Sequence, residues 1–185
     1  MAQGVSARSR RKIIPLLMLL TLLPACFGGV DKTGKVKSYA PGIVRTQKGF
    51  YNVGPLSASW RFDRIPPYKM IHFYSEEFKS SIATDAFCDD AFDDASLRTL
   101  TTHLHFDLTE RKIKSEKEFM LDDRGALRTV ALGKVDGVEI VLDTVVIKKD
   151  NCLFDFILVG DPAFHEKAAA DFEQFFGGFK YQGAI

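Results

Sequence analysis

The sequence predicts an α+β domain in which helices pack on a mainly antiparallel β-sheet. Two observations carry this prediction. Most of the chain after residue 56 consists of short apolar or alternating segments separated by turn signals, which is typical of antiparallel strands. Two other segments repeat their apolar residues at the spacing of a helix.

The first expected strands precede residue 90. Residues 57–62 (SASWRF) alternate around Trp60, and residues 68–74 (YKMIHFY) form a β-branched and aromatic run after the chain breaker Pro66-Pro67. Residues 79–87 (KSSIATDAF) should run antiparallel to that second strand.

A second group of strands fills much of the later half of the chain. Two turn signals, Asp136-Gly137 and Asp150-Asn151, separate apolar segments here. The segments are expected to form strands at residues 113–121, 127–135, 138–148 and 152–159.

The first helix is expected around Leu97, Leu100 and Leu104, which share one face at i, i+3 and i+7. Residues 93–96 (DDAS) offer its N-caps.

The second helix should begin at Asp161-Pro162, an N-cap followed by proline at the first helical position, and end at Gly177-Gly178. We interpret its apolar stripe as core rather than as a cofactor site. The stripe consists of Phe164, Ala168, Phe172, Phe175 and Phe179.

The N-terminus has the pattern of a secretory signal. Residues 8–12 carry four basic side chains, and an apolar run of 11 residues follows at residues 13–23. This run is shorter than the roughly 20 residues that a spanning helix needs. The small residue Ala25 then precedes Cys26, as expected at a cleavage site.

Leu23-Pro24-Ala25-Cys26 resembles the lipobox of bacterial lipoproteins. The resemblance implies that Cys26 receives lipid and that the signal peptide, residues 1–25, is removed. The alternative is an ordinary cleaved signal followed by a chance cysteine. Residues 9–14 (SRRKII) partly match the twin-arginine export motif, with general secretion as the default route.

Phe27 stands at the place where many such lipoproteins retained in the inner membrane carry aspartate. By the same resemblance, we expect an outer membrane lipoprotein that faces the periplasm, with the inner membrane as the alternative.

Residues 26–38 are expected to form a flexible tether, and residues 39–185 a single globular domain. Removing residues 1–25 takes away four basic and no acidic residues, which leaves 21 basic against 24 acidic side chains, a net charge of about −3. Because no basic stripe remains to neutralise phosphates, a nucleic-acid partner is not expected. Instead, we expect the membrane, through the N-terminal lipid, and an envelope protein as partners.

Assigning Cys26 to lipid leaves Cys88 and Cys152. Two remaining cysteines in an oxidising compartment favour one disulfide, with two separate buried thiols as the alternative. The cysteine and histidine spacing offers no zinc site, and no cofactor is expected.

The motifs along the chain resemble those of a group of small bacterial envelope lipoproteins, over about residues 55–180. The resemblance implies a PsbP-like α/β/α sandwich with an antiparallel sheet between helices, and it brings no catalytic residues. The matching motifs are Trp60, Cys88, residues 97–104, Asp136-Gly137-Val138, residues 148–155 (KKDNCLFD) and residues 172–179.

Two polar clusters contain residue types that can bind metal ions. His103 and His105 point apart on a helix, whereas His103 and Asp107 could share an ion. The simpler interpretation is a solvated face opposite a buried side formed by Leu104 and Phe106. The second cluster comprises Asp89, Asp90, Asp93 and Asp94, which fit helix capping better than a calcium loop, since its glycine and terminal glutamate are missing.

Asp155 lies between Phe154 and Phe156 in an apolar strand, where a carboxylate needs a partner. We expect Arg124 or Arg128 to supply it, so that Asp155→Ala lowers stability. A catalytic acid is the alternative, but no second carboxylate or nucleophile is evident in register.

The sequence therefore predicts a lipid-anchored, non-enzymatic envelope lipoprotein that presents a protein-interaction surface in the periplasm. A periplasmic small-molecule or lipid-binding module, with an apolar pocket between sheet and helix, is the alternative. A hydrolase with a dispersed site is a third and weaker option.

Overall fold

The computed structural model describes residues 36–63, 70–88 and 94–183. The chain divides into two units, Met1–Val30 and Asp31–Ile185, and the description below concerns the second. The signal peptide, Cys26 and most of the expected tether lie outside the described residues, as do Asp89, Asp90, Asp93 and Pro66-Pro67.

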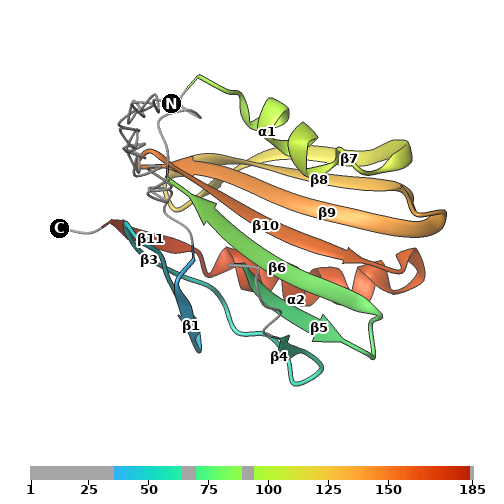
Figure 1. The fold of residues 1–185 in the computed structure, drawn as a ribbon, viewed down its shortest axis with the longest axis horizontal. Coiled ribbons are helices and arrows are strands. Elements are labelled where there is room, and N and C mark those ends of the chain that lie inside the picture. Colours follow the sequence, from blue (N-terminus) through green and yellow to red (C-terminus); the bar gives the residue numbers. More distant parts are fainter. Residues whose placement is uncertain (1–35, 64–69, 89–93, 184–185) are drawn as a thin grey trace, which may run out of the picture. The chain divides into compact units, whose positions relative to one another are not determined.

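A seven-stranded, entirely antiparallel sheet forms the centre of the domain, in the order β4-β5-β6-β10-β9-β8-β7 (Figure 1). The predicted α+β class and most predicted strands are confirmed. The strand bounds are β4 Arg61–Asp63, β5 Ile71–Ser75, β6 Ser80–Phe87, β7 Thr109–Leu121, β8 Arg124–Val135, β9 Val138–Lys149 and β10 Cys152–Gly160.

The two predicted turns connect the long strands as expected. Asp136 and Gly137 have φ values of 50° and 81°, and Asp150 and Asn151 have 52° and 57°. Two successive residues in the left-handed region give the backbone twist that a tight hairpin needs, and Asp, Asn and Gly tolerate it best. These turns fix the register of β8, β9 and β10.

The predicted strand at residues 57–62 is largely wrong, because only Arg61 and Phe62 of it belong to a strand. The Trp60 amide donates to the Ser57 carbonyl, so the chain turns here instead. Trp60 is buried against Phe78, and its indole N–H donates to Asp171 at 2.7 Å. The alternating pattern therefore reflects side-chain packing on a turn.

A second, four-stranded sheet was not predicted. Its order is β1-β2-β3-β11, with β1 Ser38–Ala40, β2 Ile43–Arg45, β3 Gly49–Asn52 and β11 Lys180–Gly183. Val36 is buried and the Lys37 amide donates to the Arg45 carbonyl, so these two residues of the expected tether pack on the domain.

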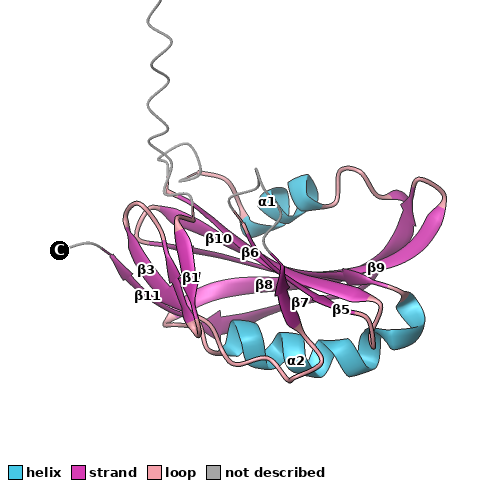
Figure 2. Cartoon of the chain, turned by 60° about the horizontal axis from the view of Figure 1, so that its bottom comes forward, coloured by secondary structure: helices cyan, strands magenta, loops and turns pink. Residues whose placement is uncertain are grey.

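Two helices flank the large sheet on opposite faces (Figure 2). Helix α1, Leu97–Leu104, begins at the predicted cap Ser96, whose hydroxyl accepts the Thr99 amide. Helix α2, His165–Gly177, follows a short 3-10 turn, η2 Pro162–Phe164, and Asp161 caps that turn. Within the described ranges, neither helix has the length and hydropathy that a membrane-crossing helix requires.

The main core lies between the large sheet, α2 and the small sheet. Tyr51 of β3 packs edge-on against Phe154 and Phe156 of β10, and Phe179 lies against all three rings. Phe172 and Phe175 of the predicted stripe are fully buried in this core. The aromatic stripe of α2 is thus core, as predicted.

Candidate functional site

A pocket of about 420 Å³ lies between α1 and the face of the sheet that α1 covers. It is here called the α1 pocket. Most of its wall is apolar, and Asp155 contributes a carboxyl group to it. The lining residues are Phe87, Ala95, Leu100, His103, Leu104, Leu153 and Asp155.

Strand alternation in β10 places Asp155 in this pocket. Phe154 and Phe156 point into the core on the α2 side, so Leu153 and Asp155 face α1. Asp155 is 5% exposed, and its Oδ1 atom has no hydrogen-bond partner among the described residues. A buried oxygen of this kind is costly to leave unpaired, so it marks the pocket as a binding-site candidate.

Neither predicted arginine pairs with Asp155. Arg124 lies 3.8 Å from Asp150, and Arg128 binds Asp143 and Glu173. Side chains two apart along a strand share a face of the sheet. The ladder register therefore shows that both arginines lie on the face opposite Asp155. Arg128 pairs with Val145 in the ladder, on the face opposite Asp155.

A second carboxylate is in register after all. Asp85 of β6 is the direct ladder partner of Asp155. Burial, followed by the charge of Asp85, raises the pKa of Asp155 to about 7. The predicted strands at residues 79–87 and 152–159 contain both residues, but their pairing register could not be read from the sequence.

Of the two histidines, His103 is exposed as predicted, whereas His105 differs from the prediction. Helix α1 ends at Leu104, so His105 turns inward: it is 2% exposed, and its Nε2 lies 3.1 Å from the Thr144 hydroxyl. Burial and, secondly, the charge of Arg111 lower the pKa of His105. Phe106, expected on the buried side, is 85% exposed, while His103 lies at the α1 pocket.

A larger polar cluster lies on the other face of the sheet and was not predicted. The buried Asp143 accepts two hydrogen bonds from Arg128, at 2.9 and 2.7 Å, and lies 3.0 Å from His165 at the start of α2. Although burial would raise the pKa of Asp143, these partners hold it below its ordinary value. Every charge here has a partner, so we interpret the cluster as an attachment of α2 to the sheet.

The predicted disulfide is present between Cys88 and Cys152. Cys88 follows β6 and Cys152 begins β10, one step beyond the ladder pair Phe87–Leu153. The bridge closes the end of the two strands that carry Asp85 and Asp155.

The described residues place no three His, Cys, Asp or Glu side chains so that they could hold a metal ion. What the α1 pocket offers is a buried acid among apolar walls. When protonated, the acid can donate a hydrogen bond, and when ionised it can bind a cation.

No protein-family model and no curated protein matches this sequence. Among solved structures, the domain is similar to cyanobacterial PsbP (CyanoP) from Synechocystis, with 13% identity, a TM-score of 0.51, and coverage of 86% of this chain and 99% of that one. The fold is PsbP-like.

A second PsbP-like neighbour is LpqN of Mycobacterium tuberculosis, a protein described as involved in cell envelope biogenesis. It is 12% identical, with a TM-score of 0.53, and the match covers 82% of this chain and 91% of LpqN. The fold expected from the family resemblance is therefore confirmed, while membership of the lipoprotein group stays a prediction.

Proposed function

We propose that this chain is a lipid-anchored protein of the bacterial cell envelope whose PsbP-like domain acts by binding in the periplasm. The observation that carries the proposal is the pairing of Cys88 with Cys152. It fits an oxidising compartment and leaves Cys26, directly after the apolar segment, as the remaining thiol of three cysteines. The similarity to LpqN, which is described as involved in cell envelope biogenesis, supports the same location.

The anchor is tested by replacing Cys26. The variant Cys26→Ala should move the protein from the membrane fraction to the soluble periplasmic fraction, because it has no thiol to receive the lipid that would hold it in the membrane. Val30→Ala, in the same N-terminal segment, is the matched control and should stay in the membrane fraction. Membrane retention of the Cys26→Ala variant would contradict the proposal.

The first candidate for what the domain binds is a protein partner at the edge strand β7. This 13-residue strand has β8 on one side only, and its side chains are almost all exposed. Two of them are large and apolar, since Ile113 is 50% and Met120 70% exposed. An extended segment of a partner could add to such an edge through its backbone hydrogen bonds.

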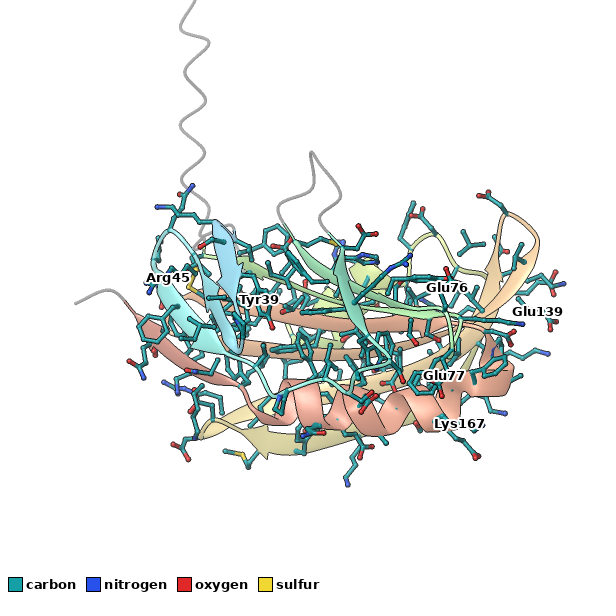
Figure 3. The ribbon with its side chains drawn as sticks, turned by 90° about the horizontal axis from the view of Figure 1, so that it is seen from below. Tyr39, Arg45, Glu76, Glu77, Glu139 and Lys167 are labelled. Atoms are coloured by element: carbon teal, nitrogen blue, oxygen red, sulfur yellow. A yellow bond between two sulfur atoms is a disulfide. The ribbon has the colours of Figure 1, made fainter. Side chains whose placement is uncertain are left out.

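A photo-reactive cross-linker at Ile113 should capture a protein in the native envelope, and Met120→Lys should reduce the yield of that adduct. A cross-linker at Lys167, which projects from the outer side of α2 (Figure 3), is the control and should give no equivalent adduct. Equal adducts from both positions, or no effect of Met120→Lys, would argue against β7 as the binding edge.

The second candidate is a small molecule in the α1 pocket. Here the supporting observation is the buried Oδ1 atom of Asp155, which no described residue pairs with, in an apolar cavity of ligand-binding size. The two candidates use different surfaces and can be tested separately.

A further inference from the structure

The chemistry of the α1 pocket restricts the kind of molecule that it can hold. Its walls come from α1, from Ala95 before α1, and from the strands β6 and β10. They are mostly apolar, and a ligand must cover them with an apolar body to gain binding energy. The pocket volume, about 420 Å³, is suited to a small organic molecule.

The polar end of such a ligand would meet the carboxyl group of Asp155. Three charged or titratable groups come from the elements around this carboxyl: Asp85 of β6 is its direct ladder partner, Lys148 of β9 is on the same face of the sheet, and His103 of α1 lines the pocket. Lys148 is the ladder partner of Leu153, and its ammonium donates to the Ala95 carbonyl at 2.8 Å. His103 is largely exposed to solvent.

The buried carboxyl group decides the sign of the ligand. The Oδ1 atom of Asp155 accepts no hydrogen bond from the described residues, and Asp85 places a second carboxyl group beside it in the ladder. An anionic ligand would be repelled by these carboxyl groups, whereas a cationic N–H donor would pair with the ionised Asp155.

We propose that the α1 pocket binds a small organic ammonium ion, with its apolar body against Leu100, Leu104 and Leu153 and its N–H groups donating to Asp155. This inference deepens the second candidate function and rests on it. The ammonium takes the place of the proton on Asp155, so binding displaces one proton wherever that carboxyl is protonated in the free protein.

Proton displacement gives the proposal a distinctive signature. Burial beside Asp85 raises the pKa of Asp155 to about 7, whereas a simple alkylammonium stays charged throughout this range. Affinity should therefore increase about tenfold for each pH unit between pH 5 and 7 and level off above pH 7.

The probe is hexylammonium, compared with the neutral 1-hexanol and the anionic hexanoate in NMR titrations at pH 5, 6, 7 and 8. The protein is the full-length chain with Cys26→Ala, which needs no detergent, and its disulfide is verified by mass. Hexylammonium should bind at least tenfold more tightly than 1-hexanol at pH 8, and hexanoate should bind more weakly than either.

Two variants locate the site. Asp155→Asn keeps the shape of the side chain and should weaken hexylammonium binding at least tenfold at pH 8 and remove its pH dependence. Leu104→Phe should weaken binding of both hexylammonium and 1-hexanol by filling the pocket. Asp136→Asn, the same chemical change in the β8–β9 turn, is the matched control and should bind like the parent chain.

Equal binding of hexylammonium and 1-hexanol, or unchanged hexylammonium binding in Asp155→Asn, would overturn the ammonium proposal while leaving an apolar pocket as a function. Absence of binding by all three probes would overturn both. Membrane anchoring is measured by fractionation, so its failure would be distinguishable from either result.

Discussion

At the residue scale, Asp155 should give the folded domain an unusual pH dependence. The unfolded chain releases this proton near the ordinary pKa of 3.8, whereas burial beside Asp85 raises the pKa in the folded domain to about 7. Between these values the folded state holds a proton that the unfolded state has lost. The contribution of Asp155 to stability is therefore greatest at low pH and falls by about 1.4 kcal/mol per pH unit between about pH 4 and pH 7.

Asp155→Asn should abolish this dependence. Urea unfolding of the parent and the variant should give similar free energies near pH 4, with the variant becoming more stable above pH 7 by up to about 4 kcal/mol. Because no arginine among the described residues pairs with Asp155, the sign is opposite to that expected for a salt-bridged carboxylate. A variant that is less stable than the parent at pH 8 would show that the ionised carboxylate has a favourable partner.

The cluster around Asp143 shows that charged partners can lower the pKa of a buried acid. Asp143 is fully buried as well, yet Arg128 and His165 hold its pKa below the ordinary value. Its contribution to stability is present at neutral pH and is lost as the pH falls through its lowered pKa. Two buried aspartates on opposite faces of one sheet thus act on stability in opposite directions.

At the element scale, the attachment of α2 depends on two glycines. The Gly54 amide donates to the Phe175 carbonyl at 2.8 Å, and a Cβ at Gly54 would overlap the backbone carbonyl of Gln174. A Cβ at Gly178 would likewise overlap the backbone of Gly54. The backbone of α2 can approach the segment after β3 only because neither residue has a side chain.

Gly54→Ala should therefore lower the free energy of unfolding by about 3 kcal/mol, since the backbone of one segment must move away from the other. Gly177→Ala is the matched control in the last turn of α2, where a Cβ meets nothing within 4 Å. It should be neutral or stabilise by up to about 1 kcal/mol. Chemical denaturation would measure both, and equal effects would contradict the close-approach argument.

The sequence predicted those elements whose signal is local. The hairpins at Asp136-Gly137 and Asp150-Asn151 combine long apolar strands with turn residues that favour positive φ, and both are present. The small sheet has strands of only three or four residues, and β3 pairs with β11 across more than a hundred residues. Such pairings depend on tertiary contacts that no local pattern contains.

The site was only partly predictable for a related reason. Alternation placed Asp155 in a buried strand, as found, but its neighbours depend on which strands pair and in which register. The residue at which α1 ends was also not predicted, and it determines which of the following side chains are buried. Because the helix stops at Leu104, His105 and Phe106 no longer follow helical periodicity, and their burial is the reverse of the prediction.

At the scale of the whole molecule, the disulfide joins two strands that are far apart in the sequence but adjacent in the sheet. Cys88 and Cys152 are 64 positions apart in the sequence, and the segment between them includes α1 and the strands β7, β8 and β9. Closing a loop of this length lowers the entropy of the unfolded chain, which corresponds to about 4 kcal/mol of stability in the chain-entropy model. β6 and β10 occupy the middle of the seven-stranded sheet, so the bridge stabilises its central pair.

Replacing both cysteines by serine should therefore lower the free energy of unfolding by about 4 kcal/mol, measured in urea against the oxidised parent. Reduced parent protein should match the double variant, because in the chain-entropy model the stability comes from the covalent link rather than from the side chains. Cys26→Ala is the control for a cysteine outside the bridge and should leave the unfolding curve unchanged. If Cys26→Ala destabilised the domain as much as the double variant, Cys26 would have to be part of the fold, and its assignment as an attachment point for lipid would be wrong.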